Sequence, residues 1–199
     1  IKDALVHAYR CLIEGWGRYA VTAIGDDSIL LQQQKEHATK RAHELLCRLE
    51  GLSDATMVPS SCYSSVMLAL SISGLPSAAT DAEDVLQRMM SQYGIQEDFN
   101  PSLLPLNSFN VNDVALAFSA CIAAHAQNND APNAEAVLNR MIDLYDDGVL
   151  GADFVPEARA FGSCIALWGK YDPSQLKTGS SRRIATKKKG SRKDLPSYQ

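Results

Sequence analysis

The chain has 199 residues, of which 46% are hydrophobic and 21% charged, a composition that favours folding over disorder. This length suffices for one compact core or a short array of repeats, and it excludes two ordinary domains. No apolar run approaches the roughly 20 residues that cross a bilayer, so we expect no membrane segment. Because the first residue is Ile1, we expect the sequence to be a fragment that lacks any targeting peptide.

The net charge of −4 is unevenly distributed along the chain. Residues 1–171 carry 11 Lys and Arg against 21 Asp and Glu, whereas residues 172–199 carry 8 against 2. The first segment is therefore acidic, at −10, and the second is basic, at +6. We expect the acidic body to repel a polyanion and the basic tail to attract one.

The cysteines and histidines give no pattern typical of a metal site. Five cysteines is an odd number, no CxxC pair occurs, and small or apolar neighbours suggest buried thiols in a reducing compartment. The histidines are not at HxxxH spacing, so we predict no metal and no cofactor. There is also no GxSxG, no phosphate-binding glycine loop and no histidine placed by pattern beside a Cys or Ser, so we expect no catalytic residues and no enzyme.

Two helical patterns alternate through residues 1–171. The A segments begin with an aromatic residue, followed by an aliphatic residue or Met four positions on and a large residue three beyond it; they start at Tyr9, Tyr63, Phe118 and Phe161. The B segments are 82–89 and 134–141, which are identical at six of eight positions, and a weaker copy at 42–49. Their apolar residues recur at i, i+3, i+4 and i+7, which predicts seven helices in the order A-B-A-B-A-B-A, with no strand.

Helix boundaries can be placed from capping residues. Asn112 and Asp113 are expected caps of the third A helix, and Asn129 or Asp130, before Pro132, is expected to open the next helix. Gly94 and Gly148 are expected to adopt the left-handed conformation after two B helices.

Other residues mark the ends and interruptions of the array. Pro173 predicts that the last A helix ends at about Tyr171. Residues 22–36 and 96–112 are expected to be insertions in loops. The low-complexity basic segment 172–199 is expected to be disordered.

The third repeat resembles the pentatricopeptide-repeat family most closely. Phe118, Ile122, Ala134 and Met141 match the helix-A aromatic, the helix-A aliphatic, the helix-B alanine and the helix-B methionine of that family, at the same separation. Pro156 matches the proline that closes a repeat. The resemblance covers residues 1–171, about three and a half repeats, and implies an α-α superhelix, or solenoid, of antiparallel helix pairs. The first two repeats are longer than the family's unit.

The resemblance implies binding of single-stranded RNA, one nucleotide per repeat, by two side chains of each repeat. The residues after the helix-A aromatics are Arg10, Ser64, Ser119 and Gly162. The last residue of a repeat is Glu157, after Pro156, so that Ser119 with Glu157 is the expected base reader; Ser60, after Pro59, holds the same place in an earlier repeat. The function implied is a noncatalytic adaptor in RNA processing, stability or translation, in a mitochondrion or plastid.

The acidic charge of the body and the small number of repeats weaken the expectation of RNA binding. Phosphate neutralisation supplies much of the affinity for RNA, so an acidic body with few repeats should bind weakly or as part of a longer array. The alternative is a protein-binding scaffold of tetratricopeptide type, although the helix-A pattern of that family is not matched. The tail has three interpretations: a solvated end, a nonspecific phosphate contact, or a nuclear-import-like signal. The aromatic and Met stripes are expected in the core rather than as base-stacking platforms.

Overall fold

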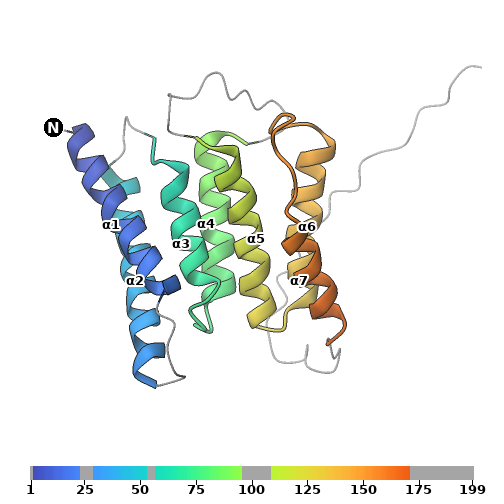
Figure 1. Ribbon diagram of the computed structural model, residues 1–199. Coiled ribbons are helices and arrows are strands. Elements are labelled where there is room, and N and C mark those ends of the chain that lie inside the picture. The colour runs from blue at the N-terminus through green and yellow to red at the C-terminus, as the bar shows by residue number, and fades with distance from the viewer. Residues whose placement is uncertain (1, 23–28, 53–56, 96–108, 171–199) are drawn as a thin grey trace, which may run out of the picture.

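The computed structural model describes residues 2–22, 29–52, 57–95 and 109–170, and within these ranges every regular element is an α-helix (Figure 1). The helices are α1 (Lys2–Thr22), α2 (Ile29–Leu52), α3 (Ser60–Leu70), α4 (Ala78–Tyr93), α5 (Val111–Gln127), α6 (Ala131–Asp146) and α7 (Ala158–Trp168). Their number, order and all-α class confirm the prediction. None of these described helices combines the length and apolar content of a membrane-spanning segment.

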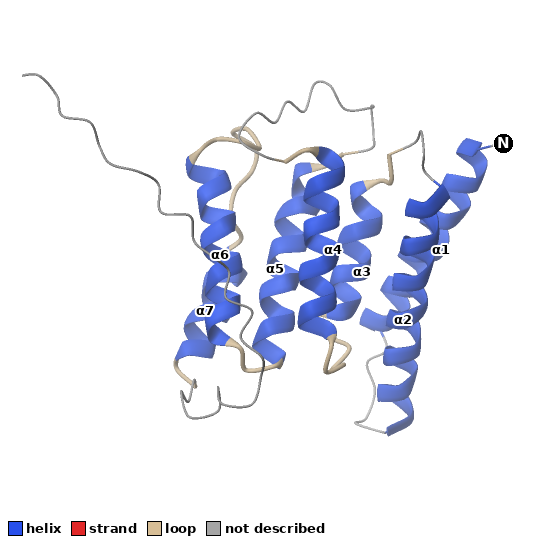
Figure 2. Ribbon diagram, turned by 180° about the vertical axis from the view of Figure 1, so that it is seen from behind, coloured by secondary structure: helices blue, strands red, loops and turns tan. Residues whose placement is uncertain are grey.

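The helices form two layers. Figure 1 faces the A helices α1, α3, α5 and α7, and Figure 2, seen from behind, faces the B helices α2, α4 and α6. Each A helix packs on the next A helix, and each B helix packs on the A helices before and after it in the chain. Within the described ranges the backbones of successive B helices do not come as close together. This pattern of neighbours is compatible with a helical repeat.

One stripe of each A helix, which we call the forward stripe, is buried in α3 and α5, partly buried in α1 and exposed in α7. It consists of the aromatic residue and the residues four and seven positions after it. In α3 these are Tyr63, Met67 and Leu70; in α5 they are Phe118, Ile122 and His125; in α7 they are Phe161, Ile165 and Trp168. The α3 and α5 members are buried, whereas Ile165 is 73% exposed. The predicted core role of the aromatics is therefore confirmed for Tyr63 and Phe118, and Met89 and Met141 are buried as well. The prediction is wrong for Phe161, which is 37% exposed, and Tyr9 is only partly buried.

A second stripe of each A helix, the backward stripe, is buried except in α1. It consists of the residue before the aromatic and the residues three and six positions after the aromatic. These are Ala8, Leu12 and Gly15 in α1; Cys62, Val66 and Ala69 in α3; Ala117, Cys121 and Ala124 in α5; and Ala160, Cys164 and Leu167 in α7. Leu12 is 51% exposed, whereas every member in α3, α5 and α7 is buried. The forward stripe is exposed at α7 and the backward stripe at α1, so exposure of the two stripes falls at opposite ends of the described array.

Several predicted boundaries are confirmed and one is wrong. Asp130 caps α6, accepting a hydrogen bond from the Asn133 backbone N–H, and Gly94 and Gly148 both have positive φ. The cap of α5 is Asn110, whose side chain accepts from the Asn112 backbone N–H, so the predicted caps Asn112 and Asp113 lie inside the first turn. Asn110 takes this role because its extended backbone lets its side chain reach the second helical N–H.

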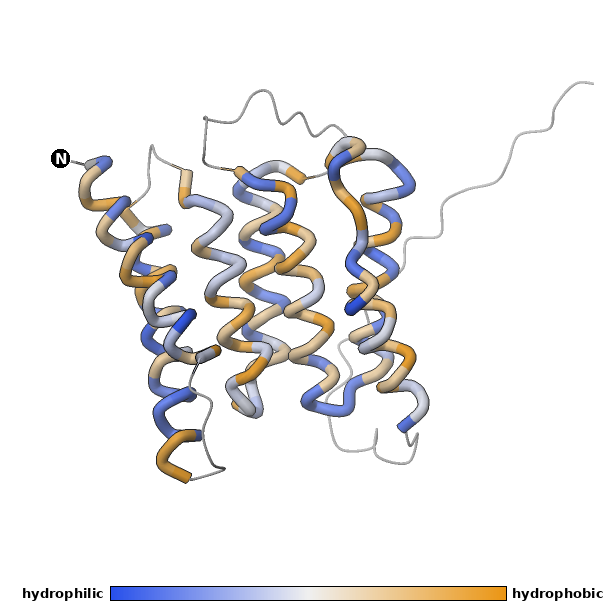
Figure 3. Tube along the Cα trace, viewed as in Figure 1, coloured by the Kyte–Doolittle hydropathy of each residue, from blue (hydrophilic) through white to orange (hydrophobic). Residues whose placement is uncertain are grey.

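The predicted insertion at 22–36 is also wrong in part, because residues 29–36 form the first turns of α2. Ile29 and Leu30 are exposed there, at the lower apolar end of α2 in Figure 3. The helix α7 ends at Trp168 with Gly169 as its cap, slightly before the predicted end at Tyr171. Most of the second predicted insertion and the whole tail, 172–199, lie outside the described residues.

The contact between α1 and α3 depends on a glycine. A Cβ atom added to Gly17 would lie 2.9 Å from the backbone oxygen of Ser65, a distance that real Cβ atoms do not tolerate. A Cβ atom added to Gly15, two residues earlier on α1, would meet nothing within 4 Å. The two glycines therefore provide a matched pair for testing how closely A helices must approach.

We predict opposite effects of alanine at these two positions. Gly17→Ala should destabilise the protein by about 1–2 kcal/mol, because overpacking outweighs the gain in helix propensity. Gly15→Ala should leave stability unchanged or raise it by up to about 1 kcal/mol. Urea denaturation followed by circular dichroism measures both; equal effects would show that α1 and α3 are not in tight contact.

Candidate nucleic-acid interface

The residues expected to read RNA lie on successive A helices. Arg10 is on α1, Ser64 on α3, Ser119 on α5 and Gly162 on α7, each directly after the aromatic residue of its helix. Glu157 is the residue at the N-cap of α7, and its side chain does not cap the helix. The fold therefore places the first four residues at equivalent positions on neighbouring helices, but their surroundings differ.

Arg10 is exposed and bound within its own helix. Its Nε donates to Glu14 Oε1 at 2.8 Å, and Ser61 of α3 donates to the same oxygen at 2.9 Å. Partial burial opposes ionisation of Glu14, but the hydrogen bonds from Arg10 and Ser61 outweigh it and lower the pKa of Glu14 below its usual value. Because the guanidinium is already partly neutralised by Glu14, it offers less charge to a phosphate than a free arginine would.

Ser64 faces the next A helix rather than an open surface. It is 3% exposed, and its Oγ lies 3.3 Å from Asp113 Oδ1 of α5, to which it donates. Ser60 donates to the other carboxylate oxygen of Asp113 at 2.6 Å. Asp113 therefore joins α3 to α5, and it also places an acidic group beside the position expected to meet RNA.

Ser119 is 3% exposed, and its hydroxyl makes no hydrogen bond within the described part of the chain. The expected pair of Ser119 with Glu157 is therefore not joined by a hydrogen bond in this conformation. Gly162 is exposed and has no side chain to offer. Of the five expected residues, the structure leaves Arg10 and Gly162 open to solvent, Glu157 partly open, and both serines buried.

Side chains of the B helices form a second set of contacts between repeats, which the sequence patterns did not reveal. Arg88 of α4 forms an ion pair with Glu50 of α2, and its Nη2 lies 3.0 Å from His43 Nε2. Arg140, at the same place in the next B segment, donates to Gln87 Oε1 of α4 at 3.1 Å. The arginine shared by the B segments thus reaches back to the preceding B helix. Its recurrence in all three B segments was the signal that could have found this contact.

The Arg88–Glu50 ion pair lies beside two side chains whose pKa values are shifted, His43 and Tyr63. Burial and the nearby Arg88 guanidinium lower the pKa of His43, so that neutral imidazole is favoured. The Tyr63 hydroxyl lies 2.9 Å from Glu50 Oε1. Burial and this carboxylate raise the pKa of Tyr63 above its usual value. The buried phenol therefore remains a hydrogen-bond donor, and Arg88 supplies the positive charge that balances Glu50.

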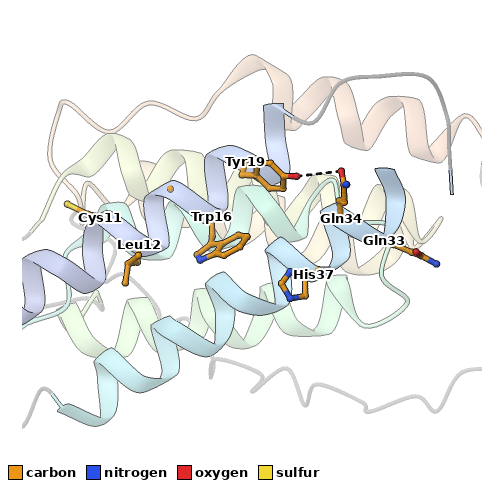
Figure 4. A pocket seen from close by; sticks show the side chains of 8 residues that line it. Cys11, Leu12, Trp16, Tyr19, Gln33, Gln34 and His37 are labelled. Carbon is orange, nitrogen blue, oxygen red and sulfur yellow. Dashed lines mark hydrogen bonds between the residues drawn. The ribbon is translucent and has the colours of Figure 1, made fainter. Parts of the chain in front are cut away.

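A hollow opens on the surface of α1 and α2 that lies at the N-terminal end of the described array (Figure 4). Its volume is about 680 Å³, and it is lined by Cys11, Leu12, Gly15, Trp16, Tyr19, Gln33, Gln34 and His37. The Trp16 ring packs edge-on against Tyr19 and His37, with centroids 6.1 and 5.8 Å away. The Tyr19 hydroxyl donates to Gln34 Oε1 at 3.5 Å. We call this hollow between α1 and α2 the end-face hollow. The seven-residue spacing of Leu5, Leu12 and Tyr19 is the sequence signal that could have indicated this apolar side of α1, on which all three residues are exposed.

The cysteines divide into two groups. All five are free; Cys62, Cys121 and Cys164 are buried as predicted, but Cys11 and Cys47 are exposed, so the prediction is wrong for these two. Cys11 lines the hollow on α1 and α2, and Cys47 Sγ accepts a hydrogen bond from Arg88 Nη1 of α4 at 3.5 Å. Cys11 Sγ also lies 3.2 Å from His7 Nδ1, a pairing through helical i, i+4 spacing that the sequence analysis missed. No group of three or more potential metal ligands occurs in the described ranges.

We predict that Arg88 contributes more to stability than an arginine in an exposed ion pair. Arg88→Met should cost about 1–2 kcal/mol, because Glu50 would keep its charge in a half-buried site without its partner. The matched control is Arg41→Met, which removes the exposed pair of Arg41 with Glu44 and should cost less than about 0.5 kcal/mol. Chemical denaturation of the two variants measures the difference, and equal losses would contradict this role of Arg88.

We also predict that thiol reactivity separates the cysteines. Burial raises the pKa of Cys62 and Cys121 to about 12, and it raises the pKa of Cys164 as well. In native protein at pH 8, iodoacetamide should modify Cys11 and Cys47 at least about 100-fold faster than the other three. Peptide mass spectrometry over time measures this, with urea-unfolded protein as the control in which all five should react. Fast modification of Cys121 in native protein would contradict its burial.

Comparisons with family models, with curated proteins and with solved structures find no match to this chain.

Proposed function

We propose that this chain is a noncatalytic helical-repeat adaptor that binds single-stranded RNA and acts in RNA processing, stability or translation. The observation that carries the proposal is the alignment of equivalent positions after the helix-A aromatic on four neighbouring A helices. An array of this kind offers one position per repeat to successive nucleotides, as the resemblance to pentatricopeptide repeats implies.

The unequal spacing of the two layers supports a superhelical array. The A helices pack directly on one another, whereas the B helices are joined by long side chains such as Arg88 and Arg140. A layer that is tighter on one side curves toward that side. The proposed solenoid would therefore have the A helices on its concave surface, where Arg10 and Gly162 are open to solvent.

Charge sets the expected strength of binding. The body carries −10, and Asp113 and Glu14 lie among the contacts between A helices, so phosphate attraction must come mostly from the basic residues of 172–199. We propose that the repeats contribute a weak preference among bases and that the tail contributes nonspecific affinity. The proposed site of action is a mitochondrion or plastid, which the family resemblance suggests.

We predict that RNA binding is salt-dependent and mostly lost without the tail. Fluorescence anisotropy with a labelled single-stranded RNA pool should show affinity falling steeply with salt for residues 1–199, with a smaller slope for residues 1–171. Residual binding by 1–171 supports reading by the repeats. If removing the tail abolishes all binding, the repeats are not the reader and the proposal fails.

Ser119 offers a clean test of base reading. Because its buried hydroxyl has no hydrogen-bond partner among the described residues, Ser119→Ala should leave stability unchanged or slightly raise it. If Ser119 reads a base after a local opening of α5, Ser119→Ala should change RNA preference while thermal stability stays constant. Unchanged preference would remove Ser119 from the site. Ser163→Ala, at a partly exposed position of α7 two residues after Phe161, is the control.

A second candidate function is a protein-binding scaffold. The specific observations that favour it are the acidic body and the apolar end-face hollow, neither of which suits a polyanion. In this case RNA would bind to the tail alone, and the anisotropy experiment above distinguishes the two functions.

A further inference from the structure

Comparison of the backward stripe in the four A helices shows which neighbour the end-face hollow lacks. In α3, α5 and α7 this stripe is buried wherever a preceding repeat is present, and Cys164 of α7 contacts the backbone oxygen of Ala134 in α6 at 3.5 Å. The same position in α1 is Leu12, which is 51% exposed and lines the hollow. The hollow therefore lies where, in each of the other repeats, the preceding B helix packs on the A helix.

A charged residue of α2 that lies about three helical turns beyond His37, outside the hollow, follows the same rule. Arg48 of α2 occupies the place that Arg88 and Arg140 hold in the other B segments. Arg88 pairs with Glu50 of the preceding B helix, and Arg140 donates to Gln87 of the preceding B helix. Arg48 is exposed and has no ion pair or hydrogen bond to any described residue. The α1–α2 end of the array thus presents an apolar hollow and, farther along α2, an exposed arginine at the position that contacts the preceding B helix in the other repeats.

We propose that the end face of α1 and α2 is a docking site for an amphipathic helix of a partner protein. The helix that fits has the pattern of this chain's own B helices: small and aliphatic residues toward Leu12 and Trp16, and a carboxylate or amide side chain toward Arg48. Apolar burial at Leu12, Trp16 and Tyr19 supplies affinity, and the acceptor for Arg48 fixes the register of the helix. This inference rests on the second candidate function, the protein-binding scaffold, and does not depend on RNA binding.

A second copy of the chain fits this site less well. The end that a second copy would offer is α7, an A helix that is exposed along its forward stripe. Stacking α7 on α1 supplies an A helix but no B helix, so the hollow would remain partly open. Arg48 would then also lack the acceptor that Glu50 and Gln87 provide in the interior contacts. A helix with the B pattern satisfies both requirements.

The probe is a labelled peptide of residues 78–94, the sequence of α4 with its terminal Gly94. In the chain, α4 already packs before α5 and offers Gln87 to Arg140. Anisotropy with the full-length protein should show saturable binding. Leu12→Glu should weaken binding at least about tenfold, because it places a charge in the apolar hollow. Ile165→Glu, a change of the same kind at the opposite end of the array, should leave binding unchanged.

The arginine contact is tested by a double-mutant cycle. Arg48→Met should weaken binding about threefold to tenfold with the wild-type peptide, and much less with a peptide carrying Gln87→Ala. A second readout is thiol protection: bound peptide should slow alkylation of Cys11, which lines the hollow, and leave that of Cys47 on α2 unchanged. These results together support a B-type helix in the hollow.

Three results would overturn the proposal. The first is no binding at millimolar peptide when circular dichroism shows that the peptide is helical in the assay buffer. The second is an equal loss of binding in Leu12→Glu and Ile165→Glu. The third is a dimer of the protein alone in sedimentation equilibrium that Leu12→Glu dissociates, because the occupant would then be a second copy.

Discussion

The close approach of successive A helices is the constraint on which the rest of the structure depends. Distances between helix axes follow the size of the side chains at the contact, and at Gly17 the α1 helix has none, so that the backbone of Ser65 comes within reach. Hydrogen bonds from serines to Glu14 and Asp113 then join neighbouring A helices. Once the A helices touch, the B helices must lie in a second layer, where long side chains such as Arg88 and Arg140 span the gap between them. The buried apolar core fills the space between the two layers.

The same packing explains why the base-reading residues are accessible on some helices and not on others. A residue directly after the helix-A aromatic lies near the contact with the next A helix. Ser64 and Ser119 are small enough to be enclosed there, and Asp113 binds Ser64 from the following helix. Arg10 is too long to be enclosed and turns along its own helix to Glu14. Small size therefore favours the compact array at the expense of access to a ligand.

The sequence predicted those features that depend on periodicity within one segment, and missed those that depend on neighbours. Seven helices, their order and the burial of Tyr63 and Phe118 follow from repeated apolar spacing. The first turns of α2 were missed because 29–36 has three aliphatic residues followed by polar ones, without the B pattern. The cap of α5 was misplaced because Asn110, Asn112 and Asp113 all have capping side chains. Exposure of Leu12 and burial of Ser119 could not be read from the sequence, because each depends on which helix lies beside it.

The arginine shared by the B segments affects which repeat units can follow one another in such a chain. The arginine lies inside the repeated segment, whereas its acceptor lies in the unit before it, so a duplicated unit carries its own connector. The acceptors are not equivalent, since Arg88 meets a carboxylate and Arg140 meets an amide. Exchanging the order of two units would therefore change the charge balance at each junction. Each junction between B helices therefore has its own donor and acceptor pair, and an array with its units exchanged would fold with mismatched junctions.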